Sequence, residues 1–164
     1  MVLTESSHQG ILSPAETEIM QRATRFSDKK AADVMVPRSR TVVWNPLIPL
    51  DANLERGRKS GHTRYPVADQ EGSRFVGIIN VKDLVWLSAA DRATLELDRV
   101  LRPLLVVSPQ DRIDAVIRDM RRRRIHIAAV EEKGVAIGIL TMEDIIEEIF
   151  GEIQDEFEPA PTPA

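Results

Sequence analysis

The sequence predicts a mixed α/β fold made of two pseudo-symmetric β-α-β-β-α repeats. Segments 77–84 and 138–145 share Gly, Ile and Asp and match at every apolar position, at an offset of 61 residues. The elements predicted around the two segments also follow the same order, and agreement between these two levels strengthens the prediction. An internal repeat indicates one supersecondary unit used twice. Two such units predict a pseudo-twofold domain with paired clefts.

Length and composition agree with one globular domain. The chain has 164 residues, of which 43% are hydrophobic and 29% charged, enough for one core or for two small halves that share one. No apolar run approaches the roughly 18–20 residues that cross a bilayer. Residues 1–10 have neither the basic nor the apolar part of a signal peptide. We therefore expect the chain to act in water.

Charge and cysteine content exclude several function classes. The chain has no cysteine, which excludes thiolate catalysis and zinc–cysteine sites. Its net charge of −4 argues against nucleic acid as a partner, because binding to phosphate backbones needs clustered positive charge. One basic run, 121–124, remains. It suits the last turn of a helix, where the helix dipole favours cations, or a contact with phosphate or a partner chain.

A lead-in is expected over residues 1–30, with one helix at 14–26. Ser13 and Glu16 have the spacing of a capping box, and Pro14 occupies the first helical position. The face expected to dock on the domain consists of Ile19, Ala23 and Phe26.

The first repeat is predicted over 31–90. Its β-branched residues and prolines favour extended segments, and Gly61 is expected to end a weak helix. At the carboxyl end of the repeat we expect a helix that begins at Val81 and has Leu84, Val85 and Leu87 on its inner face. The predicted elements are extended segments at 34–37 and 41–44, a helix at 50–60, strands at 65–67 and 75–80 around a turn at 69–73, and the helix from 81.

A polar linker, 91–100, precedes the second repeat, 101–153. The predicted elements are a strand at 104–107, a helix at 111–124, a strand at 125–130, a hairpin turn at 133–134, a strand at 135–140 and a helix at 143–149. The proline-rich tail, 154–164, is predicted to be disordered.

Four segments match the motifs of a known family. They are 33–38 (DVMVPR), 60–67 (SGHTRYPV), 122–128 (RRRIHIA) and 141–153 (TMEDIIEEIFGEI). Through them the chain resembles, over about 11–158, the tandem cystathionine-β-synthase (CBS) domain pair of CorC/HlyC-type magnesium and cobalt efflux proteins, which are related to the cyclin M transporters.

This resemblance implies a location and a partner. In that family the paired domains form the cytosolic regulatory part of a membrane protein and follow a transmembrane transport domain. The chain is accordingly expected to be cytoplasmic, beneath an inner or plasma membrane, and to form a homodimer. The alternative is a ligand-free structural dimerisation module.

Thr141 and Asp144 form the sharpest candidate site. They lie where a strand is predicted to meet a helix, and the free amides and dipole of a helix start favour an anion. A hydroxyl there can donate to phosphate, and a carboxylate can accept bonds from a ribose diol. The resemblance gives these two positions such roles toward adenine nucleotide. The same spacing is also a capping box, which needs no ligand.

Further residues join this site through the family motifs. Arg64 is expected to reach the phosphates, with His62, Tyr65 and Glu143 nearby. Val36 stands where some relatives carry Thr, and Arg38 is expected to compensate. In the matching first-repeat cleft, Asn80 and Asp83 are the counterparts, and because Asn80 supplies no hydroxyl, this cleft is the weaker of the two.

No catalytic constellation emerges, so no enzyme activity is expected. The three histidines, His8, His62 and His126, lack metal-ligand spacing, and His126 is expected to be a core residue. Carboxylates cluster from Glu143 to Glu158. We expect them to be solvated rather than to form a protein-only metal site, and we expect Mg²⁺ to enter through the phosphates of bound ATP, AMP or a similar nucleotide.

Overall fold

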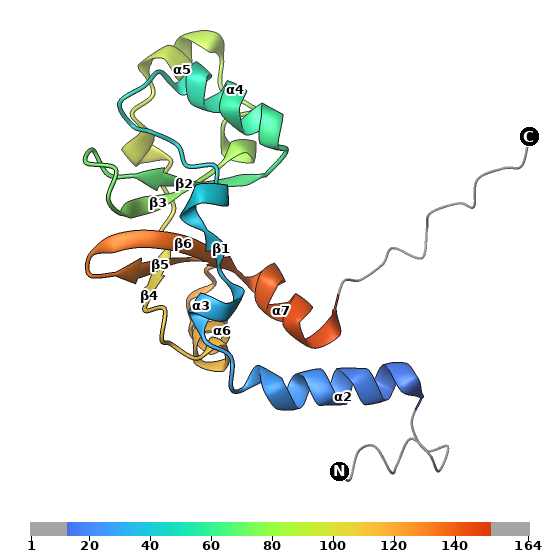
Figure 1. Cartoon of the computed structure of the whole chain (residues 1–164). Coiled ribbons are helices and arrows are strands. Elements are labelled where there is room, and N and C mark those ends of the chain that lie inside the picture. The colour runs from blue at the N-terminus through green and yellow to red at the C-terminus, as the bar shows by residue number, and fades with distance from the viewer. Residues whose placement is uncertain (1–12, 152–164) are drawn as a thin grey trace, which may run out of the picture.

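A computed structural model of the chain describes residues 13–151. The described residues form two halves stacked on each other, with one long helix at the amino end running beside the lower half (Figure 1). None of the helices in this range is long and apolar enough to cross a membrane. The expectations for residues 1–12, for the tail at 154–164 and for the acidic residues beyond Gly151 concern residues outside the described range.

Helix α2, Pro14–Phe26, confirms the prediction for the lead-in. The Ser13 side chain accepts a hydrogen bond from the Glu16 amide, and the Glu16 carboxylate accepts one from the Ser13 amide. Hydrogen bonding to the carboxylate, first by the Ser13 amide and then by the Ser13 side chain, lowers the pKa of Glu16. The predicted docking face is right only in part: Phe26 packs against the core of the lower half, whereas Ile19 and Ala23 are exposed and Thr17 is buried. Helix α2 packs mainly along one helix, α7 (Met142–Phe150), and Phe26 at its carboxyl end reaches the core.

The opening of the first repeat differs from the prediction in two places. Helix α3, Ala31–Val34, includes Val34 because the Asp33 carboxylate caps the Lys30 amide at 2.8 Å, so only β1, Val36–Pro37, is extended. A 3₁₀ turn, Arg38–Arg40, follows. The strand expected at 41–44 is reduced to a single parallel bridge between Trp44 and Val67. The strand does not continue past Trp44, because the backbone amide and carbonyl of Asn45 form hydrogen bonds with the side chain of Asn53.

The middle of this repeat is as predicted. Helix α4, Leu50–Ser60, ends at Gly61, which adopts the left-handed conformation with φ of 73°. Strands β2, Arg64–Ala68, and β3, Phe75–Asn80, pair antiparallel.

The helix predicted from Val81 is wrong. Only a 3₁₀ turn, Val81–Asp83, forms, and Val85 is 65% exposed although Leu84 is buried. The Asp83 carboxylate binds Arg102 and does not cap the Asn80 amide, so this helix start lacks its capping box. Regular structure resumes with α5, Ala89–Thr94, which Ser88 caps, and with a 3₁₀ turn at Leu97–Arg99.

The second repeat has the predicted order, with ends shifted by one or two residues. It consists of β4, Leu105–Val107; α6, Ile113–Arg123; β5, Ile127–Glu132; β6, Val135–Thr141; and α7. Lys133 and Gly134 both have positive φ, as a tight hairpin turn requires. Strand β4 is parallel to β5, and β5 is antiparallel to β6.

Each half takes an edge segment from the other repeat. The four-stranded sheet has the order β1-β6-β5-β4, so β1 of the first repeat completes the sheet of the second, with Val36 opposite Ile139. Reciprocally, Arg102 bridges Ile78 of β3 in the upper half. This exchange is the structural form of the predicted pseudo-twofold.

Glycines make the exchange possible. A Cβ on Gly138 would lie 2.6 Å from the carbonyl oxygen of Val36, and one on Gly77 would lie 2.9 Å from that of Arg102. These are the two glycines related by the internal repeat.

Three apolar clusters hold the structure together. One fills the lower half around Ile113, Met120 and Leu140, and one fills the upper half around Trp44, Tyr65 and Ile79. A small cluster of Phe75, Ala129 and Ala136 joins residues from the two halves.

Replacing Gly138 by alanine is expected to destabilise the fold by about 1–3 kcal/mol, because the added methyl group meets backbone and not a yielding side chain. Urea unfolding followed by circular dichroism measures the change. Gly134→Asn is the control, since a side chain there meets nothing within 4 Å and Asn tolerates positive φ. Equal stability of Gly138→Ala and wild type would contradict the close approach.

Candidate functional site

A cavity of about 340 Å³ opens where the two halves meet. Strand β1, the start of β2, the end of β6 and the start of α7 all contribute to its wall. All seven residues predicted for the main site line it: Val36, His62, Arg64, Tyr65, Thr141, Glu143 and Asp144. The structure thus brings together residues that are more than 100 positions apart in the chain.

Thr141 and Asp144 are tied to each other. The Asp144 Oδ2 atom accepts hydrogen bonds from the Thr141 amide at 3.0 Å and from the Thr141 hydroxyl at 2.6 Å, and the Asp144 amide donates to Thr141 Oγ1 at 3.0 Å. This is a complete capping box at the start of α7. The two bonds that the carboxylate accepts both end on Oδ2 and leave Oδ1 out, so Asp144 can cap its helix and still offer an oxygen to a ligand.

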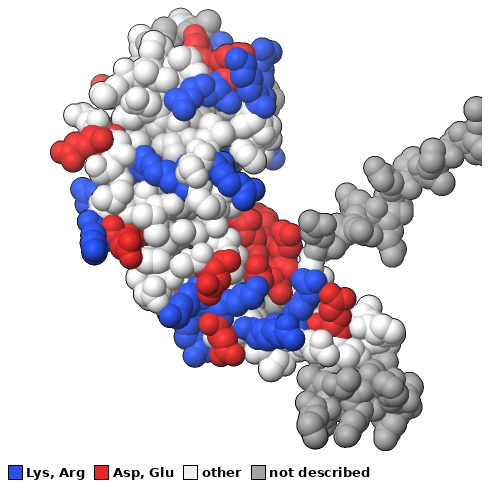
Figure 2. Space-filling model, in the orientation of Figure 1, with Lys and Arg blue, Asp and Glu red and all other residues white. Residues whose placement is uncertain are grey.

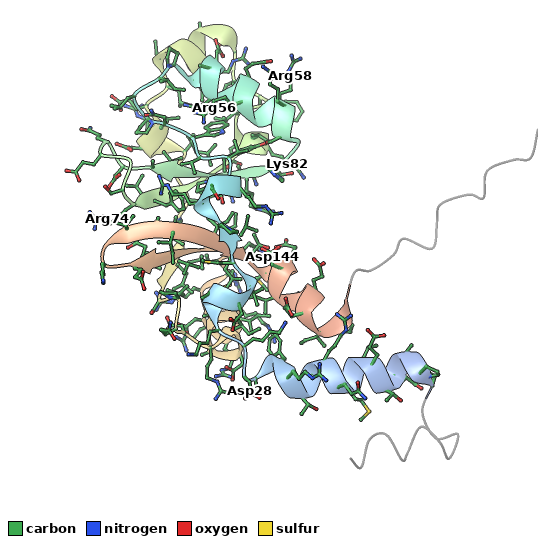
Figure 3. The ribbon with its side chains drawn as sticks, viewed as in Figure 1. Asp28, Arg56, Arg58, Arg74, Lys82 and Asp144 are labelled. Atoms are coloured by element: carbon green, nitrogen blue, oxygen red, sulfur yellow. The ribbon has the colours of Figure 1, made fainter. Side chains whose placement is uncertain are left out.

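Asp144 lies at the level where the upper and lower halves meet (Figure 3). Its side chain is half-buried, and Glu143 beside it is exposed. Acidic side chains gather over α7 (Figure 2), which carries Glu143, Asp144, Glu147 and Glu148. Among residues 13–151, no group of three or more such side chains is arranged to hold a metal ion.

Tyr65 is a core residue that supports the site. Its ring is 1% exposed and stacks on Trp44 with centroids 5.2 Å apart. Its hydroxyl lies 2.8 Å from the Gly57 carbonyl and 2.6 Å from that of His62. Tyr65 therefore fixes the loop that carries His62 to the cavity wall.

The expectation that His126 is a core residue is wrong. The side chain is exposed and lines the cavity, because β5 begins only at Ile127. Arg124 turns the chain in the left-handed conformation, with φ of 56°, and the His126 carbonyl accepts from the Met142 amide. The motif at 122–128 was the available signal for this position.

Arg38 does not serve the cavity as expected. Its guanidinium donates to the carbonyls of Gly72, at 2.7 Å, and Ala136, at 3.3 Å, and lies 4.7 Å from the centre of the Phe75 ring. Arg38 therefore joins the two halves on another face. Arg40, which sequence reasoning missed, lines the cavity in its place, as do Thr41, Val42, Thr63, Pro66, Ile127 and Ile139.

The cavity thus has charged groups of both signs and apolar walls. Arg40, Arg64, His62 and His126 supply the basic and imidazole groups, and Glu143 and Asp144 the carboxylates. Val36, Val42 and Ile139 supply apolar surface. Such a site suits a ligand with an anionic part, a polar part and a flat apolar part.

The counterparts in the first repeat do not form an equivalent site. Asp83 forms two hydrogen bonds to the Arg102 guanidinium, at 2.7 and 2.8 Å, and the Asn80 side chain accepts from the Lys82 amide. In the basic run, Arg122 pairs with Asp119 at the end of α6. That pairing agrees with the helix-end interpretation of the run.

The fold and the cavity agree with family membership. The CBS domain family model matches residues 52–89 and 97–151, more than half of the chain, and the chain belongs to this family as a CBS domain pair. More narrowly, it is related to the CorC/CNNM group. It is 32% identical over 158 residues to the magnesium and cobalt efflux protein CorC of Pasteurella multocida, covering 96% of this chain and 53% of that protein. The chain thus spans about half the length of the curated relatives it matches.

Solved structures support the same relationship. The CBS domain of the bacterial CNNM/CorC family Mg²⁺ transporter is 26% identical, with a TM-score of 0.86 and 94% of each chain covered. The complex of that domain with ATP is 28% identical, with a TM-score of 0.79, and covers 85% of this chain and all of that one. These relatives are a transport protein and the CBS domain of a transporter, which agrees with the expectation that the chain is not an enzyme.

Proposed function

We propose that this CBS domain pair is a regulatory module that binds adenine nucleotide, ATP with Mg²⁺, in the cavity between its halves. The observation that carries the proposal is the convergence of Arg64, Thr141 and Asp144 on one cavity at a strand–helix junction. The ATP complex of the related CBS domain supports it. A volume of about 340 Å³ falls at the lower end of the range for small-molecule sites.

Each part of the nucleotide has a chemical counterpart in the cavity. The Asp144 carboxylate is suited to the ribose diol, and Arg64 and Arg40 are suited to the phosphates because guanidinium binds phosphate in a bidentate manner. The apolar side chains of Val36, Val42 and Ile139 can cover the adenine. Thr141 already donates its hydroxyl proton to Asp144, so a phosphate contact requires that proton to be redirected.

The binding state can pass to the amino end of the chain through α7. The cavity lies at the start of α7, and α2 packs along the same helix. Lys29, just after α2, pairs with Glu148 of α7. A ligand that binds one arrangement of these helices more tightly shifts the population toward it. In our proposal the receiver is a transmembrane transport domain of a longer protein, with this module on the cytosolic side.

A second candidate function is a structural dimerisation module with an empty cavity. Exposed apolar side chains on α7 favour association: Ile146 is 37% and Phe150 55% exposed, while Ile145 is buried in the core. A nucleotide-binding module can also form a dimer, so dimer formation alone does not distinguish the two functions. Titration with ATP does distinguish them. ATP that binds only the folded state raises the melting temperature, whereas an empty module does not respond.

Asp144→Ala is expected to weaken ATP binding by at least about tenfold, because hydrogen bonds to a charged acceptor contribute about 1.5–3 kcal/mol. Loss of the cap is expected to lower stability by about 1 kcal/mol as well. Isothermal titration calorimetry and melting curves measure the two effects. Asp91→Ala is the matched control, because Asp91 closes the same kind of capping box on α5, away from the cavity. Unchanged affinity in Asp144→Ala, with only the stability loss, would contradict the ribose role.

Magnesium is expected to tighten ATP binding. The triphosphate approaches a helix that carries Glu143, Glu147 and Glu148, and Mg²⁺ on the phosphates relieves the repulsion between like charges. Calorimetry in MgCl₂ and in EDTA compares the affinities. The double variant Glu143→Gln/Glu147→Gln is expected to show a smaller difference between its ATP affinities in MgCl₂ and in EDTA. Equal affinity of the wild-type chain for ATP in both buffers would contradict this role of Mg²⁺.

The chain is expected to form a homodimer with Ile146 near its axis, since twofold association is the commonest way to bury such a patch. The helix predicted at 81–87 is only a 3₁₀ turn at Val81–Asp83, but Val85 and Trp86 after it are also exposed apolar residues. Ile146→Glu is expected to give a folded monomer by light scattering. Val135→Glu, at another exposed apolar residue, is expected to stay dimeric. A wild-type chain that is monomeric at high micromolar concentration contradicts the proposal.

A further inference from the structure

The exchanged segments put Arg102 and Val36 in equivalent places. Val36 lies opposite Ile139 in the lower sheet, and Arg102 lies opposite Ile78 in the upper half. Ile78 and Ile139 each follow one of the repeated glycines. The pseudo-twofold therefore relates the Val36–Asp144 side of the cavity to the Arg102–Asp83 side of its counterpart.

The two places differ in what reaches the carboxylate. In the cavity, Val36 is a short apolar wall, and within residues 13–151 Asp144 forms hydrogen bonds only inside its own capping box. In the counterpart, the Arg102 Nε atom donates to Asp83 Oδ2 at 2.8 Å, and Nη2 donates to Oδ1 at 2.7 Å. Both carboxylate oxygens are occupied. The hydrogen bond and the charge of Asp83 raise the pKa of Arg102.

The same ion pair changes the local backbone. Because Asp83 faces Arg102, it does not cap Asn80, and the α-helix that follows Thr141 in the second repeat has only a 3₁₀ turn as its counterpart. Asn80 also has no hydroxyl, and its amide oxygen accepts from Lys82. The counterpart therefore lacks a free carboxylate, a hydroxyl and a helix start.

We propose that Arg102 is a built-in plug that occupies the second nucleotide cleft and limits the chain to one nucleotide. The guanidinium lies against the carboxylate that a ribose would otherwise engage. This inference rests on the proposed function, since it takes the Asp144 cavity as the open site. Arg102, together with the missing hydroxyl at Asn80, thereby sets the stoichiometry of binding.

The plug is removable without loss of the fold. The Arg102 side chain is 58% exposed and that of Asp83 31%, and exposed ion pairs contribute little to stability. The contact between Arg102 and Ile78 that holds the exchanged segment is made by backbone atoms. A shorter side chain at 102 keeps that contact.

The test replaces residues of the closed first-repeat cleft by those found at the equivalent positions of the open cavity. Arg102→Val with Asn80→Thr gives the counterpart the residues found at Val36 and Thr141. Calorimetry with ATP and Mg²⁺ is expected to give one nucleotide per wild-type chain and two per chain of the double variant. Adding Asp144→Ala to the double variant is expected to bring the number back to one, and this remaining site is expected to disappear with Asp83→Ala.

Two nucleotides per wild-type chain, or one per chain of a folded double variant, overturns the proposal. If the wild type binds none, the proposed function fails. In that case a gain of one Asp83-dependent nucleotide by the double variant still supports the plug, and no gain overturns it. If the double variant does not fold, Asp83→Ala in the otherwise unchanged chain decides: undiminished stoichiometry and affinity support the plug, and loss of a bound nucleotide overturns it.

Discussion

The close approach of backbone at Gly77 and Gly138 is the constraint on which the rest of the structure depends. At each glycine, a segment from one repeat lies against a strand of the other, at a distance that leaves no room for a Cβ. This exchange places β1 beside β6, and so places Val36 beside the Thr141–Asp144 junction. Without it, the two halves would lack a common wall, and the cavity would have no second side.

The residues at this junction meet two demands at once. Thr141 and Asp144 cap α7 through three hydrogen bonds, and they also face the cavity. A ligand that engages them therefore acts directly on the start of a helix whose other end packs against α2. Structural and regulatory roles are coupled here because one carboxylate and one hydroxyl serve both.

The two repeats show how a few positions give one unit two outcomes. Asp83 and Asp144 occupy equivalent places, yet a long guanidinium reaches the first and a short apolar side chain lies beside the second. The helices that precede the middle strands end in the same way with different residues: α4 ends at Gly61 and α6 at Arg124, both in the left-handed conformation. The order of the elements is largely repeated, whereas the chemistry at each cleft also depends on side chains from the neighbouring repeat.

The sequence by itself determined the features that local interactions control. The internal repeat predicted two units. Ser13 and Glu16 predicted the start of α2, Gly61 predicted the end of α4, and Lys133 with Gly134 predicted the hairpin turn, because caps and turns involve neighbours in the chain. The motifs also named seven residues of the cavity wall. Only the tertiary structure decided the outcomes at Asp83, Arg38 and His126. Asp83 had a cap within three residues, but an arginine 19 positions away took its carboxylate. Arg38 found carbonyl partners in both halves, and His126 fell just outside its strand. For Asp83 and Arg38 the competing partner is distant in sequence, so no local pattern could show which interaction prevails.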